Sequence, residues 1–434
     1  MKRNKLMVRK LTPMEQLLWY SAKESPVNFT CYAHVSGKFT ISDLERALQK
    51  AVIKNPLAGA RVETRADSYP WYTTENCPPI PVRIVKTTKK CDWTQFVKQE
   101  LHLPFDMEIG PITRVVCSQK ENDQADIIFC FHHLIADGIS AITFLKDTLM
   151  FLGDAELEPF PVVDKVGLDY NIPDIEIDES NKLPDKDFIE TELDETNEAI
   201  LKTTKFHMFP QIIEEDLTSN LLKKCKEYDV SIHSALNAAL LKALMEIYYP
   251  DIYSKSLKIQ SPISLRNYLT NKIGDAFGCY ITLKKIDVEF NYYEDFWALA
   301  KKLNEKFSQS KNKKSLFPVV TQIREIANKS KILDDFIDKI KKIDFASTYE
   351  IDFEYSLSNL GRIDLPATFG NLRLNAVFAP TFSAVINERV IGALTFDNKL
   401  FINYVTRCNN LVEAEKGLSL LKRMQEIIEE VTLN

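Results

Sequence analysis

The stretch Ile127-Ile128-Phe129-Cys130-Phe131-His132-His133-Leu134-Ile135-Ala136-Asp137-Gly138 joins an apolar run to two adjacent histidines and an Asp-Gly pair. Its first five residues are wholly apolar, which predicts a strand buried on both faces of a sheet. In the residues that follow, Ile142, Leu145, Leu149 and Leu152 recur at the spacing of one helical stripe. We therefore expect the histidine pair on a strand-to-helix turn, at the carboxyl end of a strand, where ligand and catalytic groups often gather.

This turn carries residues that suit acid–base chemistry. An imidazole with a pKa near 6.5 can remove a proton from an attacking hydroxyl or amine at neutral pH, and His133 stands where it could do so. Gly138 lacks a Cβ, so it would allow a tight turn and a close approach of a ligand to the backbone. The alternative interpretation is structural: Asp137 caps the next helix, Gly138 makes the turn, and His132 and His133 are satisfied core residues.

The complete pattern resembles a known signature, His-His-x-x-x-Asp-Gly, at His132 to Gly138. Further segments of the chain are similar to motifs of the same superfamily, and they are Leu11 to Gln16, Pro104 to Asp106, Gly110 to Arg114, Pro262 to Arg266, Phe277-Gly278 and Ser358-Asn359-Leu360-Gly361. That superfamily includes chloramphenicol acetyltransferase, condensation domains of nonribosomal peptide synthetases, plant acyltransferases and alcohol acetyltransferases. The Asp-Phe-Gly-Trp-Gly motif of plant members is missing, and the Ser-Asn-x-Gly motif resembles alcohol acetyltransferase-like members.

The resemblance implies an α/β fold with mixed sheets: two chloramphenicol-acetyltransferase-like domains in a V, with the active site in a tunnel between them. It implies that His133 is the general base, and that Asp137 points away from substrate and pairs with Arg266. His132, Asp137, Gly138 and Arg266 would then support the site. Ser358 and Asn359 are candidates for oxyanion or substrate contact, although a turn explains that motif equally well.

The length of 434 residues predicts two domains. Between residues 154 and 200 there are 16 Asp/Glu against three Lys, together with several prolines, which is typical of an extended connector. We therefore expect an N-terminal acyltransferase-like domain at 1–155, an acidic connector at 156–204 and a C-terminal acyltransferase-like domain at 205–434. The rest of the chain is mildly basic, which is compatible with a phosphorylated pantetheine carrier.

Hydrophobic periodicity predicts further elements in both halves. Helices are expected at 43–52, with Ser42 as N-cap, at 231–248 and at 412–431. Strands are expected at 257–265 and, half-exposed, at 349–357. A hairpin with the three-residue loop 397–399 is expected between 390–396 and 400–405.

Composition narrows the functional class. The eight cysteines show no zinc-type spacing, so no metal site is expected. A net charge of −6 argues against nucleic-acid binding, and the sequence shows neither an export signal nor a membrane span. We expect a cytoplasmic, monomeric protein without a permanently bound cofactor, and without a carrier or adenylation region in the 434 residues.

The leading hypothesis is a free-standing O-acyltransferase. It would move an acyl group from acyl-CoA or an acyl-phosphopantetheine carrier protein to a small-molecule alcohol. The alternatives are an amide-forming condensation enzyme that acts on an amine, since an imidazole base serves either nucleophile, and a catalytically inactive binding protein of the same fold.

Overall fold

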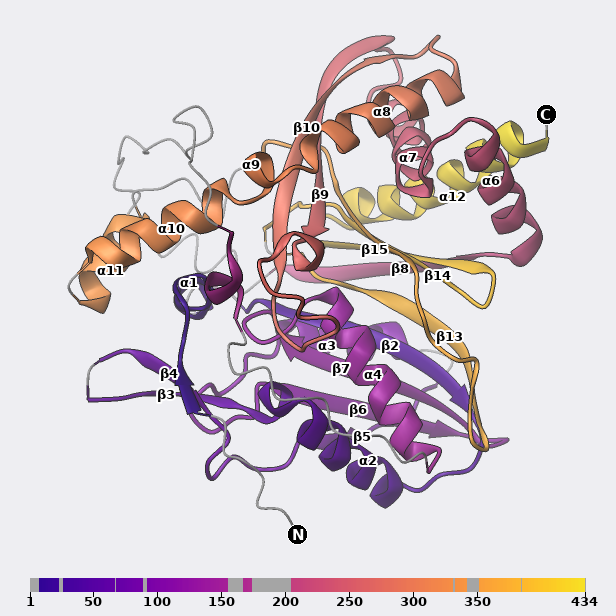
Figure 1. Cartoon of the computed structure of the whole chain (residues 1–434). Helices are drawn as coiled ribbons and strands as arrows, with labels where there is room; N and C mark the ends of the chain where they lie inside the picture. Colours follow the sequence, from indigo (N-terminus) through magenta and orange to yellow (C-terminus); the bar gives the residue numbers. More distant parts are fainter. Residues whose placement is uncertain are drawn as a thin grey trace.

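The computed structural model describes residues 8–22, 26–66, 68–88, 92–154, 167–173, 204–330, 332–341, 351–383 and 385–433. Within these residues the chain forms two six-stranded mixed sheets and one three-stranded sheet, with helices packed on them (Figure 1). The predicted α/β fold with mixed sheets is confirmed. Most of the predicted acidic connector, 156–204, lies outside the described residues, and the division into domains stays a prediction.

The first six-stranded sheet contains the strand that ends in the histidine pair. Its strand order is β12 (Thr368–Phe369), β13 (Leu372–Thr381), β2 (Asn28–Ser36), β7 (Gln124–His132), β6 (Thr113–Lys120) and β5 (Val82–Ile84). Its helices are α2 (Ile41–Lys54), α3 (Trp93–His102) and α4 (Gly138–Leu152). All of β7 after its first residue is buried, as the apolar run predicts for a strand covered on both faces.

Two strands of this sheet come from the later part of the chain. β13 pairs antiparallel with β2, and β12 pairs with β13 at the sheet edge. In Figure 1 this orange segment runs down from the upper sheet and lies beside the indigo strand β2. Because β13 joins the sheet that ends in the histidines, the two halves of the chain are tied together by backbone hydrogen bonds as well as by side chains.

The second six-stranded sheet has the strand order β10 (Ile281–Asn291), β9 (Ser254–Ser264), β11 (Ser356–Arg362), β14 (Val390–Phe396), β15 (Lys399–Cys408) and β8 (Lys205–Ile213). Its helices are α6 (Glu215–Glu227), α7 (Ile232–Tyr248), α8 (Phe296–Ser310) and α12 (Leu411–Leu433). Side chains of these helices and strands form one buried apolar cluster. The structure therefore contains three predicted elements with small shifts of their ends. They are the helices at 231–248 and 412–431 and the strand at 257–265.

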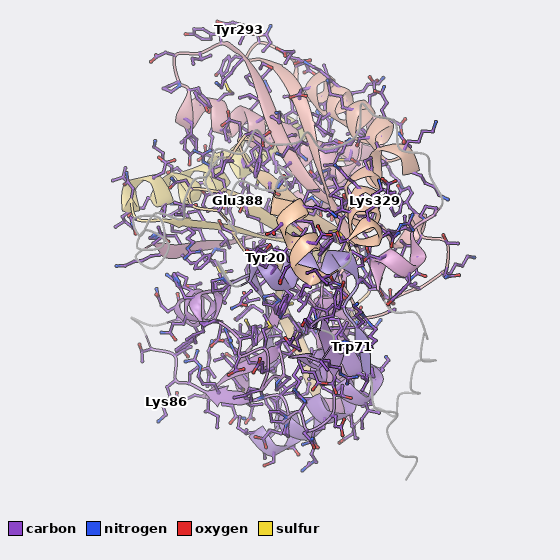
Figure 2. All side chains as sticks on the ribbon, turned by 90° about the vertical axis from the view of Figure 1, so that its left-hand side faces the viewer. Tyr20, Trp71, Lys86, Tyr293, Lys329 and Glu388 are labelled. Carbon is purple, nitrogen blue, oxygen red and sulfur yellow. The ribbon has the colours of Figure 1, made fainter. Side chains whose placement is uncertain are left out.

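Smaller elements complete the structure. They are β1 (Val8–Lys10), β4 (Pro70–Thr73) and β3 (Arg61–Thr64) of the three-stranded sheet, helices α1 (Pro13–Ser21), α9 (Lys313–Leu316), α10 (Pro318–Lys329) and α11 (Leu333–Lys341), and 3-10 turns at Pro56–Gly59, Leu168–Asn171 and Arg266–Tyr268. Tyr20, near the end of α1, packs against α10 and α11 (Figure 2). A helix from the start of the chain is thus held by helices from its second half.

Three local predictions were wrong in detail. The N-cap of α2 is Thr40, which forms a capping box with Asp43, so Ser42 lies inside the helix. In the hairpin, Phe396 pairs directly with Lys399, and the loop has two residues, both with positive φ. This is the turn geometry whose twist matches the flanking strands.

The strand predicted at 349–357 begins only at Ser356, and residues 349–350 lie outside the described part of the chain. The side chain of Tyr355 is fully buried and its hydroxyl donates to the Oδ1 of Asn237 at 3.0 Å. Two isolated backbone hydrogen bonds to β9, from Glu354 N to Lys258 O and from Gln260 N to Tyr355 O, replace a regular ladder. The alternation of apolar and polar residues in the sequence therefore indicated that Tyr355 is buried. It did not indicate a longer strand.

Among the described residues, no single helix has both the length and the apolar character needed to cross a membrane. Helices α6 and α7 meet that requirement only as a pair, with a bend of 107° between them.

Candidate active site

The two histidines lie where β7 turns into α4, as the sequence predicts. His132 is the last residue of β7 and pairs with Asn28 of β2, and the backbone N–H of His133 donates to Val27 O at 2.9 Å. Asp137 is the N-cap of α4, and its Oδ1 accepts from Ser140 N at 2.9 Å. The turn is therefore fixed at its start by a backbone hydrogen bond and at its end by the side-chain cap of Asp137.

The His133 imidazole lies between residues from distant parts of the chain. Its ring centroid is 4.8 Å from that of Phe29 and 5.0 Å from that of Phe382, and its Nδ1 is 3.6 Å from the Sγ of Cys279. The residue is half-buried. Burial lowers the pKa of His133 below its ordinary value, although the charge of Asp137 and nearby backbone carbonyls oppose this shift. The ring is therefore neutral at pH 7, which is the state that a general base requires.

His132 has a different environment. It is 1% exposed, its Nδ1 accepts from the backbone N–H of Leu134 at 3.1 Å, and the ring of Phe105 meets it edge-on. Burial, with smaller contributions from His133 and Arg114, lowers the pKa of His132 to about 3. This histidine holds the turn and stays neutral.

Asp137 and Arg266 form the ion pair that the resemblance implies. Both Arg266 Nη atoms donate to the Asp137 carboxylate, with Nη2 at 3.0 Å from Oδ1, and the exposed fractions of the two side chains are 7% and 0%. Tyr280 N also donates to Asp137 Oδ2 at 3.0 Å. Burial alone would raise the pKa of the Asp137 carboxyl, but the charge of Arg266 and these hydrogen bonds lower it below 3.8. The capping and ion-pairing interpretations are therefore both correct, because one carboxylate does both.

The sequence analysis missed two contacts beside the Asp137–Arg266 pair, those of Ser140 with Gly278 and with Arg266. Ser140 Oγ donates to Gly278 O at 2.7 Å and accepts from Gly278 N at 3.0 Å, while Arg266 Nη2 donates to Ser140 Oγ at 2.9 Å. A Cβ on Gly278 would lie 2.6 Å from the ring of Tyr280, so only glycine fits there. The Phe277-Gly278 motif was the available signal, but nothing in the sequence indicated Ser140 as its partner.

The Ser358 to Gly361 motif lies on β11 and reaches the start of α4. Leu360 covers Gly138, since a Cβ on that glycine would be 3.2 Å from Leu360 Cδ2. Gly361 N donates to Asn359 Oδ1 at 2.8 Å, which is the bond that a turn interpretation expects. Ser358 and Asn359 are half-buried, and their role in substrate contact stays a prediction.

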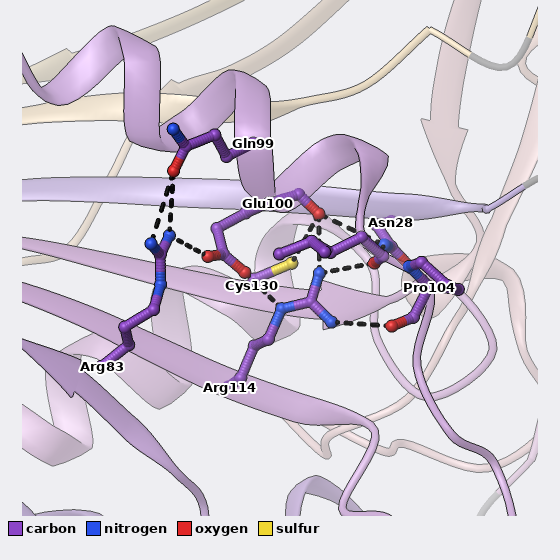
Figure 3. Close-up of polar contacts among 8 residues, drawn as sticks. Asn28, Arg83, Gln99, Glu100, Pro104, Arg114 and Cys130 are labelled. Atoms are coloured by element: carbon purple, nitrogen blue, oxygen red, sulfur yellow. Dashed lines mark hydrogen bonds and ion pairs between the residues drawn. The ribbon is translucent and has the colours of Figure 1, made fainter. Parts of the chain in front are cut away.

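A polar network supports β7 from beside the turn (Figure 3). Arg114 of β6 pairs with Glu100 of α3, and its Nη2 also donates to Glu100 O at 2.7 Å and Leu103 O at 2.6 Å. Asn28 donates from Nδ2 to the same Leu103 O at 2.6 Å. The segment before the active-site strand, which the resemblance singled out, therefore anchors the end of α3 to the sheet.

Within the described part of the chain, no group of three or more His, Cys, Asp and Glu side chains is arranged to hold a metal ion. Burial also raises the pKa of the Cys279 thiol, so that it is protonated next to His133.

Comparison with known proteins gives two family matches. A condensation-domain model matches residues 10–156, and an alcohol acetyltransferase model matches residues 192–368. Curated relatives include Fusarin C synthetase of Gibberella fujikuroi, 24% identical over 145 residues, and Bacitracin synthase 3 of Bacillus licheniformis, 28% identical over 125 residues. These matches cover 31% and 29% of this chain, and only 3% and 2% of the relatives' own length.

Solved structures resemble nearly the whole chain. The TRI3 trichothecene 15-O-acetyltransferase from Fusarium sporotrichioides is 10% identical with a TM-score of 0.67, covering 97% of this chain and 95% of its own. The first condensation domain of the CDA synthetase is 12% identical with a TM-score of 0.67, covering 98% and 96%. Polyketide synthase associated protein 5 from Mycobacterium tuberculosis is 12% identical with a TM-score of 0.63, covering 98% of each chain. At these low identities, the similarities show a shared two-lobed fold.

The signature turn, the fold and the two family matches agree: residues 10–156 match the condensation-domain family and residues 192–368 match the alcohol acetyltransferase family, which is consistent with a chloramphenicol acetyltransferase-like condensation superfamily.

Proposed function

We propose that this protein is an acyltransferase that moves an acyl group from a CoA or carrier-protein thioester to an alcohol, with His133 as general base. The observation that carries the proposal is the half-buried, neutral imidazole of His133 beside the Asp137–Arg266 pair. The match of residues 192–368 to an alcohol acetyltransferase model, and the similarity of the fold to that of an O-acetyltransferase, support it.

The chemistry needs one base and balanced proton movement. In the tautomer whose hydrogen is on Nδ1, the nitrogen that faces Cys279 Sγ, the free lone pair is on Nε2, and Nε2 would take the acceptor's hydroxyl proton. The acceptor oxygen attacks the thioester carbonyl carbon, a tetrahedral intermediate forms, and the carbon–sulfur bond breaks. The protonated imidazole then returns its proton to the leaving thiolate. Such base catalysis typically contributes about 10² to 10⁴ in rate.

The oxyanion of the intermediate needs hydrogen-bond donors. Ser358 and Asn359 are our candidates, because β11 brings their motif to the start of α4, directly after the catalytic turn. The Asn359 side chain has its Oδ1 engaged by Gly361 N, which leaves its Nδ2 as the group able to donate.

Amide formation is the second candidate, and the condensation-domain match at residues 10–156 favours it. A panel of acyl-CoA and acyl-phosphopantetheine carrier-protein donors, each with alcohol and amine acceptors, separates the two by mass spectrometry of products. We expect esters and stoichiometric thiol release, both lost in His133→Ala. Amides alone would overturn the choice of alcohol, and no thiol release with any donor would favour a binding protein of the same fold.

A further inference from the structure

A cavity lies beside His132. It has a volume of about 220 Å³, and its apolar lining includes Trp19, Val62, Phe105 and Met107. The groups that surround His133, namely Phe29, Phe382 and Cys279, do not line it. This cavity is therefore distinct from the immediate environment of the proposed base.

Two residues of the cavity lining each carry a buried polar atom that has no hydrogen-bond partner among the described residues. These atoms are Oδ1 of Asn28 and Nε2 of His132, in side chains that are 2% and 1% exposed. The two residues face each other across the β2–β7 pair. Buried polar groups are nearly always hydrogen-bonded, because burial of an unpaired one destabilises the fold, so two neighbouring exceptions beside a cavity point to a missing partner.

The donor and acceptor roles of these atoms are fixed by their other contacts. Asn28 Nδ2 donates to Leu103 O and Glu100 O, as Figure 3 shows, so the free atom is the carbonyl oxygen and it accepts. His132 Nδ1 accepts from Leu134 N, so in the neutral ring Nε2 carries the hydrogen and donates. The missing partner must therefore accept one hydrogen bond and donate another.

The remaining lining argues for a neutral partner. Burial lowers the pKa of His132 to about 3, so the ring offers no positive charge to an anion at neutral pH. Glu108, the acidic residue of the lining, would also repel an anion. An ammonium group, which has no lone pair, could not accept from Nε2–H.

We propose that this cavity binds a small neutral molecule with a hydroxyl group on an apolar body, the hydroxyl donating to Asn28 Oδ1 and accepting from His132 Nε2. A hydroxyl is the smallest organic group that does both. A cavity of about 150 Å³ already holds benzene in another protein, so the space suits one six-membered ring with a substituent. The site does not depend on acyl transfer, because His132 and not His133 holds the hydroxyl.

Phenol and toluene test this directly, since they have the same number of non-hydrogen atoms and differ only in the hydroxyl. Their dissociation constants are measured by ligand-observed NMR on the full chain, with no acyl donor present. We expect phenol to bind at least about tenfold more tightly than toluene, because toluene leaves both buried groups unpaired. Equal affinities, or no binding of phenol, would overturn the proposal whatever the outcome of the acyl-transfer assay.

Three variants test whether phenol binds in this cavity. His132→Phe should abolish the preference for phenol and still bind toluene, while His207→Phe, a half-buried histidine of β8 outside the cavity, should keep the preference. Ala22→Phe, a half-buried position of the lining, should fill the space and weaken both ligands about tenfold or more; it also provides the test if His132→Phe does not fold. Unchanged phenol binding in Ala22→Phe, or a crystal structure at saturating phenol with only water between Asn28 and His132, would show that the proposal is wrong.

Discussion

Replacing Asp137 by alanine removes one carboxylate that accepts hydrogen bonds from Ser140 N, Tyr280 N and both Nη atoms of Arg266. Loss of the helix cap costs about 1 kcal/mol, and a buried N–H left unpaired at Tyr280 adds about 1 to 3 kcal/mol. The largest effect is on Arg266, whose side chain is 7% exposed and would keep an unpaired charge. Stranding one partner of a buried pair costs about 3 to 5 kcal/mol, so we expect Asp137→Ala to lose at least about 4 kcal/mol.

Arg266→Ala leaves Asp137 with its two backbone donors but without its cation, and should cost about 3 to 5 kcal/mol. In the double variant neither charge is stranded. The double variant should therefore be less damaged than the sum of the single variants by about 2 to 3 kcal/mol. Asp137→Asn is a further comparison, because it keeps an oxygen acceptor for Ser140 N while it removes the charge and places an amide donor where Oδ2 accepts from Tyr280 N and Arg266 Nη1.

Urea denaturation followed by tryptophan fluorescence measures the free energies of unfolding of the wild type and the four variants, provided that the denaturant slopes agree. Effects of Asp137→Ala and Arg266→Ala that add to within about 0.5 kcal/mol would refute the energetic coupling. A loss of only about 1 kcal/mol in Asp137→Ala, with Asp137→Asn nearly neutral, would show that the carboxylate acts as a helix cap alone.

Three further predictions concern the same turn and the Gly278 segment that packs against it. His133→Ala should lower turnover by about 10² to 10⁴ with little change in melting temperature, and wild-type turnover of the purified variant would exclude His133 as the base. Folded His132 stays neutral down to a pH of about 3, whereas the unfolded chain protonates it below about 6.5. Wild-type stability should therefore fall as pH decreases through this window, by a little over 1 kcal/mol per pH unit from this residue, and His132→Phe should flatten the slope in denaturation curves. Gly278→Ala should lower stability by about 1 to 3 kcal/mol, because its Cβ would overlap the buried Tyr280 ring, and an unchanged melting temperature would contradict this packing.

The strand, turn and helix around the histidines could be predicted because their signal is local. An apolar run of strand length and a helical stripe each define their own element, and β7 and α4 match them closely. The pairing of β13 with β2 could not be predicted in this way. Alternation shows that a segment is a strand but does not say which sheet it joins, and β13 enters a sheet whose other central strands lie more than 200 residues earlier.

Because sequence patterns identify an element but not its partners in space, some contacts at the site were predicted and others were missed. Arg266 was linked to Asp137 through a family resemblance, whereas Ser140 and Tyr280 carry no motif of their own and reach the site through packing across the two halves. The sequence also presented capping and ion pairing as alternatives for Asp137. They are compatible because Oδ1 faces the start of α4 while Oδ2 faces Tyr280 N and Arg266 Nη1.

This double role has a mechanical consequence for the proposed base. The residue that begins α4 is also the residue that binds Arg266, so a shift of the β9–β10 segment relative to the first sheet would pull directly on the turn that carries His133. His133 itself contacts Cys279, which precedes Tyr280 in that same segment. Contacts from both halves of the chain therefore hold the imidazole, and we expect substitutions at Arg266 to change turnover even though that side chain donates to Asp137 and not to His133.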